Sequence, residues 1–135
     1  MESRLIDLSK YRLSRAKEDL TASRIDFDNH QFAASMNRSY YAIFHAIRSV
    51  NSLEGFDSRK HAGVIAYFNR FFLKTGKISN SRRMSEIIKD ARRFREKSDY
   101  EDFFIAVRDD AEEQLQNAAL FVEIISKFLE DFQSE

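Results

Sequence analysis

The chain of 135 residues contains no cysteine, no proline and only three glycines. Without cysteine it can form neither a disulfide framework nor a thiolate metal site. Without proline, and with glycine only at Gly55, Gly63 and Gly76, few positions force the backbone out of a helix. No apolar run approaches the roughly 20 residues of a membrane span, and the N-terminus lacks the apolar segment of a signal peptide. We therefore expect a cytoplasmic protein with no membrane contact.

Charge is balanced overall but unevenly distributed. The net charge is zero, yet residues 1–78 carry 13 basic and 8 acidic side chains, residues 79–98 carry 7 and 3, and residues 99–135 carry 2 and 11. Such a gradient permits an anion-binding face opposite an acidic one. Ordinary solvated helix faces would give a similar count, so the gradient alone does not select a function.

Apolar residues recur at helical spacing along the whole chain. The last segment is the most regular, and its stripe predicts a helix that opens near Asp109. Long helices with short connections favour antiparallel neighbours. We therefore expect a single all-α domain over residues 1–135, an up-and-down antiparallel bundle of about five helices. The predicted helices run from about Leu5 to Phe27, from Asp28 to Leu53, from Ser58 to Gly76, from Ser81 to Lys97 and from Asp109 onward.

Two local signals mark the ends of the second helix. Asp28 with Gln31 three residues later resembles a capping box that opens the helix. Gly55 can adopt the left-handed conformation that commonly ends one.

An arginine and a histidine share one face of this second helix. Arg38 and His45 are seven positions apart, which at about 100° per residue returns to the same face about 10.5 Å along the axis. An arginine can hold a phosphate, and a histidine can transfer a proton near neutral pH. Together they are a minimal set for cutting RNA without a metal.

The residues around this pair are small rather than charged. The apolar side of the helix carries Phe32, Met36, Tyr40, Ile43 and Ile47, and the opposite side carries Ala34, Ser35, Arg38, Tyr41, Ala42, His45 and Ser49. Small residues allow close approach, so we expect this face to pack against a second element or a second copy of the chain. Two structural alternatives stay open: His45 bonded to a carbonyl or an acid, and Arg38 in an ion pair, for example with the acidic fifth helix.

The other candidate features are weaker. His30 is expected to be an exposed turn residue, and His61 could join a polar cluster. The histidines lack metal-ligand spacing and there is no Gly-rich phosphate loop, so we expect no metal and no cofactor. A basic run could track phosphates or could be a solvated face; it comprises Arg82, Arg83, Lys89, Arg92, Arg93, Arg95 and Lys97.

Three stretches give the chain a family resemblance. Residues 37–46 (NRSYYAIFHA) resemble the signature of small stand-alone prokaryotic HEPN-domain proteins (higher eukaryotes and prokaryotes nucleotide-binding). Residues 60–65 (KHAGVI) and 98–100 (SDY) fit the same branch, in the expected order and at the expected spacing.

The resemblance implies a helical bundle that is commonly a homodimer. The family that the chain resembles includes metal-independent endoribonucleases, which are often toxins paired with a minimal nucleotidyltransferase antitoxin. Their motif is an arginine and a histidine separated by four to six residues, which Arg38 and His45 match at the long end. By resemblance, Arg38 would hold the scissile phosphate and His45 would be the general acid or base. Many active members have asparagine, aspartate or histidine after the arginine, where this chain has Ser39.

The leading hypothesis is thus a metal-independent endoribonuclease, and the alternative is a non-catalytic module that binds a nucleotide or a nucleotidyltransferase. We expect the catalytic residues to be Arg38 and His45, and contacts to RNA or a nucleotide to come from Ser39, Tyr41, Arg92 and Arg93.

Overall fold

A computed structural model describes residues 3–133, and over these residues it contains helices and no strand. A short 3-10 turn (Ser52–Glu54) follows the second helix, and a π-helical turn (Asn69–Leu73) follows the third. The expected all-α fold with about five helices is confirmed. The α-helices are α1 (Ser3–Asp28), α2 (Phe32–Asn51), α3 (His61–Phe68), α4 (Ser81–Tyr100) and α5 (Arg108–Gln133).

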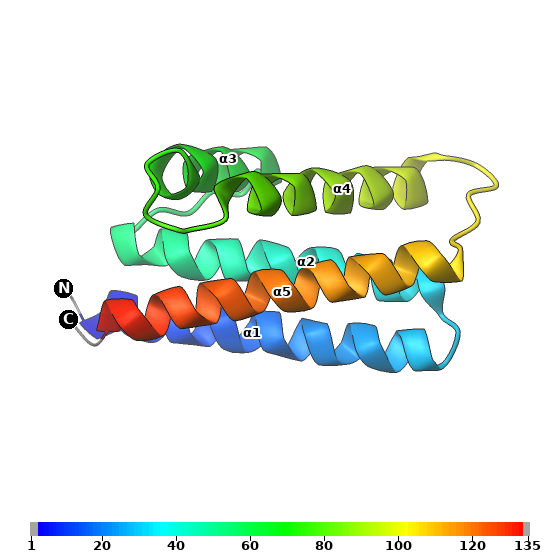
Figure 1. The fold of residues 1–135 in the computed structure, drawn as a ribbon, viewed down its shortest axis with the longest axis horizontal. Helices are drawn as coiled ribbons and strands as arrows, with labels where there is room; N and C mark the ends of the chain where they lie inside the picture. The colour runs from blue at the N-terminus through cyan, green and yellow to red at the C-terminus, as the bar shows by residue number, and fades with distance from the viewer. Residues whose placement is uncertain (1–2, 134–135) are drawn as a thin grey trace.

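The long helices run lengthwise and alternate in direction, as an up-and-down bundle (Figure 1); they are α1, α2, α4 and α5. The short α3 crosses the bundle near the end where α2 finishes and α4 begins (Figure 1). The central helix is α2, which contacts each of the other four α-helices. Because α2 is surrounded in this way, side chains on it reach solvent only between its neighbours.

The apolar stripes predicted from the sequence form the core. Ile43 and Ile47 of α2 are buried in one continuous apolar cluster that also contains Phe121 and Ile125 of α5. The predicted stripe of α5 is buried at Ala111, Leu115, Ala118, Val122, Ile125 and Leu129. Burial of such a stripe removes apolar surface from water and stabilises the fold by about 25 cal/mol for each Å² buried. None of the described helices is long and apolar enough to cross a membrane.

The predicted capping box at the start of α2 is wrong. Asp28 is the last residue of α1, and α2 begins at Phe32 after Gln31, which makes no side-chain cap. Between them His30 takes a left-handed conformation with φ of 60° and is exposed, in agreement with its expected place in a turn. The rings of Phe27 and Phe32 pack across this turn with centroids 5.6 Å apart. An apolar contact therefore joins α1 to α2, and the capping pattern in the sequence did not predict it.

The third helix is shorter than the sequence pattern predicts. It begins at His61 rather than Ser58, because the Ser58 hydroxyl accepts a hydrogen bond from the backbone N–H of Lys60 and holds these residues in a turn. The end predicted for α2 is confirmed, since Gly55 has a φ of 70° directly after the 3-10 turn. The fourth helix continues past Lys97 to Tyr100.

Candidate functional site

The small-residue face of α2 packs against α1 of the same chain. Ser23 of α1 donates a hydrogen bond to the backbone carbonyl of Ser35 (2.8 Å), and its hydroxyl lies 2.8 Å from that of Ser39. The Ser35 hydroxyl donates in return to the carbonyl of Ser23 (2.9 Å). All three serines are fully buried. Of the two partners considered for this face, a second element or a second copy, the structure therefore shows a second element.

This packing brings one buried carboxylate between the two candidate catalytic residues. Arg38 Nη1 donates a hydrogen bond to Asp19 Oδ1 (3.1 Å), and His45 Nε2 lies 3.7 Å from Asp19 Oδ2. The side chain of Arg38 remains 52% exposed, whereas that of His45 is 13% exposed. Arg38 thus forms an ion pair, but with α1 rather than with the acidic helix α5 that the sequence suggested.

Two polar atoms in this cluster lack a hydrogen-bond partner although they are buried. They are Asp19 Oδ2 and His45 Nδ1. A buried polar atom without a partner loses its contacts with water and gains none in return, which costs about 1–3 kcal/mol. Such atoms are uncommon in folded proteins, and functional sites are among the places where they occur.

The electrostatic surroundings of His45 favour the neutral imidazole. Burial lowers the pKa of His45 below its ordinary value of 6.5; the Asp19 carboxylate opposes this effect, and the charges of Arg48, Arg15 and Arg12 add to it. The balance leaves a histidine that is mostly neutral near pH 7 and close to a carboxylate that can stabilise its protonated form.

A second carboxylate orders two of these arginines. Arg12 Nη2 and Arg48 Nη2 each lie 3.0 Å from Asp57 Oδ2. Partial burial acts to raise the pKa of Asp57, but the hydrogen bonds from Arg48 and the Ser58 N–H, with the charge of Arg12, lower it overall. The positive charge around His45 is therefore held in place by the loop that follows α2.

A second polar cluster lies on the side of α2 that faces α3 and α4. Tyr40 Oη and His61 Nδ1 share a hydrogen bond of 2.8 Å. Arg95 Nη2 donates to Tyr41 Oη (3.3 Å), and its guanidinium lies 4.8 Å from the Tyr40 ring centroid. His61, which the sequence placed only in a possible polar cluster, is thus a member of one.

Tyr41 connects the two clusters. Its ring centroid is 6.1 Å from that of His45 and 6.0 Å from that of His61. Burial lowers the pKa of His61, and the charges of Arg95, Arg92 and Arg48 lower it further. The structure therefore joins residues of α1, α2, α3 and α4 in one polar face; we call it the histidine face, and it comprises Asp19, Arg38, Tyr41, His45, His61 and Arg95.

The other expected RNA contacts have different surroundings. Ser39 is fully buried and bonded to Ser23, so its hydroxyl does not reach the surface; this burial is at odds with a contact to RNA. Arg93 lies 3.7 Å from Asp90 and over the ring of Phe94. Arg92 is partly buried, and its charge acts on His61.

Asp19, His61 and Arg95 were not singled out by the sequence as site residues. One signal was present for Asp19: it follows Ala16 by three residues and precedes Ser23 by four, so it shares a helix face with two small residues, and both of these are buried. A carboxylate on a buried face is rare unless it is paired. The contacts of His61 and Arg95 join positions 34 residues apart, and no local pattern indicates them.

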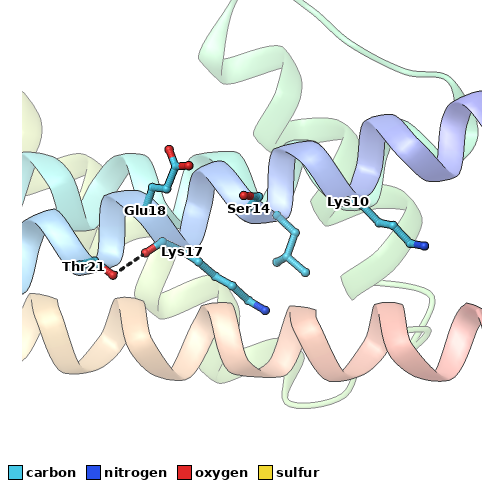
Figure 2. Close-up of a pocket in the computed structure, with 6 residues that line it drawn as sticks. Lys10, Ser14, Lys17, Glu18 and Thr21 are labelled. Carbon is cyan, nitrogen blue, oxygen red and sulfur yellow. Dashed lines mark hydrogen bonds between the residues drawn. The ribbon is translucent and has the colours of Figure 1, made fainter.

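A separate hollow of about 580 Å³ runs along α1 and is lined by residues between Lys10 and Thr21. Figure 2 shows Lys10 and Lys17 extending from this side of the helix, and the hydrogen bond from Thr21 to the carbonyl of Lys17. Neither Arg38 nor His45 lines this hollow. Over the described part of the chain, no three histidine, aspartate or glutamate side chains are arranged to hold a metal ion.

Comparison with known proteins gives a consistent assignment. The model of the HEPN domain matches residues 9–129. A "UPF0332 protein" of Thermotoga maritima is 28% identical over 124 residues, which are 92% of each chain. A protein of Methanocaldococcus jannaschii named "Putative toxin MJ0605" is 33% identical over 86% of this chain and 84% of its own. A "UPF0332 protein" of Gloeobacter violaceus is 30% identical over 87% of this chain and 92% of its own.

Proposed function

The chain belongs to the HEPN domain family, and on this premise we propose that it is a metal-independent endoribonuclease. One observation carries the proposal: Arg38 and His45 converge on a single carboxylate, Asp19, so they occupy one face in a defined relative position. A half-exposed guanidinium beside an imidazole is suited to a phosphodiester, because the first binds its charge and the second moves a proton.

The proposed chemistry needs no metal. Arg38 binds a non-bridging oxygen of the scissile phosphate and stabilises the charge that develops there. His45 transfers a proton during attack by the neighbouring ribose 2′-hydroxyl, which leaves a cyclic phosphate and a free 5′-hydroxyl. When a phosphate engages Arg38, the Asp19 carboxylate remains beside His45 and stabilises its protonated form.

The biological setting follows from the same resemblance. Two relatives carry names that describe putative toxins, which supports a toxin-like role acting on RNA in the cytoplasm. The proposed partners are then RNA and a minimal nucleotidyltransferase that serves as antitoxin. RNA would also contact Tyr41 of the histidine face and Arg92, whose charge acts on His61, together with Arg93 of the same helix.

We also propose that the protein is a homodimer. The connection between α4 and α5 carries Phe103 and Ile105, whose side chains are exposed at 99% and 81%, beside the exposed Tyr100. Adjacent exposed apolar side chains are a common mark of a protein interface. A second copy would cover this segment.

Purified protein incubated with RNA in the presence of a chelator tests the nuclease proposal. Cleavage is expected for the wild type, and Arg38→Ala and His45→Ala should each lower the rate by about 10²-fold or more. The exposed turn variant His30→Asn is the matched control and should cleave normally. Cleavage that persists unchanged in both site variants would remove these residues from the mechanism.

The non-catalytic alternative keeps one observation in its favour. His45 is largely covered, and Arg38 is already paired with Asp19, an arrangement that also suits a structural role. Binding of a nucleotide or a nucleotidyltransferase without RNA cleavage at any protein concentration would favour a binding module over the nuclease.

A further inference from the structure

A basic groove lies between the π-helical turn that follows α3 and the first turns of α4. It has a volume of about 520 Å³, and among the described residues that line it none is acidic or aromatic. Four other hollows on the described surface each include at least one carboxylate. We call this one the α3–α4 groove; the cations that line it are Arg70, Lys74, Arg82 and Lys89.

The local backbone brings these cations to one groove. The N–H of Lys74 donates to the carbonyl of Asn69 at 2.9 Å, a bond that spans five residues and closes the π-helical turn. Turns of this kind inside helices are frequent at functional sites. On the opposite side of the groove, Arg82 and Lys89 are seven positions apart in α4, so they share one face of that helix.

The charges on this groove are available to a ligand. Over the described residues, neither Lys74 nor Lys89 forms an ion pair or a side-chain hydrogen bond, and both are exposed. The side chain of Arg82 is 95% exposed, and its contact with Glu86 of the same helix is 3.7 Å long. Such an exposed pair contributes little free energy, so a phosphate can replace it. Like charges around one hollow repel one another, and an anion bound between them relieves the repulsion.

Neutral donors complete the lining of the groove. Ser81 and Ser85 are about one turn apart in α4, and neither hydroxyl bonds to another described residue. Asn69 has a buried Oδ1 without a partner, which leaves Nδ2 as the end of the amide that a ligand can reach. The first turn of α4 holds no acidic side chain, and its free N–H groups add partial positive charge.

A path of cations joins this groove to the histidine face. Lys89, Arg92 and Arg95 follow one another every three residues, so each is turned about 60° from the last and lies about 4.5 Å further along α4. At the far end, Arg95 Nη1 is 3.4 Å from His61 Nδ1, and the charge of Arg92 lowers the pKa of the same imidazole. From Arg82 to Arg95 the path is about 20 Å long.

The composition of the groove favours the backbone of a nucleic acid strand over a free nucleotide. Nucleotide pockets and single-strand platforms hold bases on apolar or aromatic side chains, and none of the described lining residues is aromatic. Cations spread over about 20 Å suit a chain of phosphates, whereas one phosphate engages only a part of them. Phosphate contacts of this kind carry no sequence information, and salt weakens them steeply.

We propose that the α3–α4 groove binds the phosphate backbone of RNA outside the point of cleavage, so that one strand runs along α4 to the histidine face. The inference rests on the proposed nuclease function for the identity of the ligand. It adds a binding surface that neither Arg38 nor His45 lines. Because its cations bind phosphates that do not react, they contribute to KM more than to kcat.

The double variant Lys74→Gln/Lys89→Gln tests this surface. Both residues are exposed and without a side-chain partner among the described residues, so the fold should be kept, and circular dichroism checks it. The matched control is Lys10→Gln/Lys17→Gln, which removes the same charge from the hollow along α1. The ligand is a fluorescent 2′-O-methyl RNA of about 12 nucleotides, which has no free 2′-hydroxyl and is therefore not cleaved.

Binding is measured by fluorescence anisotropy over a series of salt concentrations. The slope of log affinity against log salt should become shallower by about 1.4 in Lys74→Gln/Lys89→Gln, since each phosphate contact to a single strand contributes about 0.7. The control should keep the wild-type slope. The loss of affinity should be similar for strands of different sequence and absent for a dinucleotide, which is too short to reach the groove from the histidine face. With cleavable RNA, the groove variant should raise KM and leave kcat unchanged.

Three results would overturn the inference while leaving the nuclease proposal intact. The first is an unchanged slope in the groove variant, and the second is an equal change in the α1 control, which would indicate a general effect of charge. The third is adenosine monophosphate or inorganic phosphate binding as tightly as the strand and lost in the groove variant, which would indicate a pocket for a small anion. Conversely, absence of RNA cleavage by the wild type, with the groove effect retained, would remove the nuclease and keep the strand-binding surface.

Discussion

The carboxylate of Asp19 on α1 lies 3.1 Å from Nη1 of Arg38 on α2. The second oxygen of this carboxylate faces Nε2 of His45 at 3.7 Å. Asp19 therefore couples the position of Arg38, the candidate phosphate-binding residue, to the protonation of His45. It is the residue through which the packing of α1 on α2 acts on the site.

Replacing Asp19 with asparagine tests this coupling. The variant removes a negative charge that acts to raise the pKa of His45, so that pKa should fall further below its ordinary value in Asp19→Asn. Titration of the imidazole signals by NMR measures the shift. Asp90→Asn is the matched control, because Asp90 contacts Arg93 instead. An unchanged His45 titration in Asp19→Asn would show that the carboxylate does not act on this ring.

Stability should fall as the pH drops below about 6.5. The pKa values of His45 and His61 are lowered in the folded chain, so between those values and 6.5 the unfolded state binds more protons. The free energy of unfolding therefore rises with pH through this window and is fully regained above it. Urea unfolding at a series of pH values measures the slope.

The His45→Gln and His61→Gln variants should each flatten this slope. The carboxylate of Asp57 acts in a lower window: its lowered pKa contributes stability that is present above pH 3.8 and is lost as the pH falls through its folded-state pKa. Equal slopes in the wild type and both site variants would contradict the assignment to these histidines.

Ser39 should behave as a packing residue and not as a ligand contact. Ser39→Ala leaves Ser23 bonded to Ser35 and should cost about 1 kcal/mol, with RNA binding retained. Ser39→Asn adds atoms to a fully buried site and should cost about 1–3 kcal/mol through overpacking. Chemical denaturation and RNA binding by fluorescence anisotropy, compared in the same preparations, test both statements. Loss of RNA affinity in a stable Ser39→Ala variant would show that Ser39 contributes to RNA binding after all.

The apolar segment between α4 and α5 should contribute to self-association. Exchange of Phe103 and Ile105 for serine removes two exposed apolar side chains and should weaken the proposed dimer by about tenfold or more, because burial of such groups drives association. Analytical ultracentrifugation over a range of concentrations measures the change. Tyr11→Ser, an exposed aromatic on α1, provides the comparison; an equal effect of both changes would argue against a specific contact at this segment.

Much of the fold could be predicted from the chain itself. Periodic apolar residues placed five helices, and the regular stripe of α5 is buried as expected. Helix ends were less predictable where an apolar contact between side chains, and not a capping hydrogen bond, stabilises the turn. The ring contact of Phe27 with Phe32, for instance, replaced the capping box expected at Asp28.

Sequence alone determined which residues share a helix face, because the angle between side chains on one helix depends only on their spacing. Arg38 and His45 were placed together for this reason. Tertiary structure alone decided what faces them: Asp19 from α1, and His61 and Arg95 from α3 and α4. These contacts join distant positions, and they depend on how helices dock and on which side chains the docking buries. Docking also placed Ser39 inside the α1–α2 contact, which no helical wheel could distinguish from an open face.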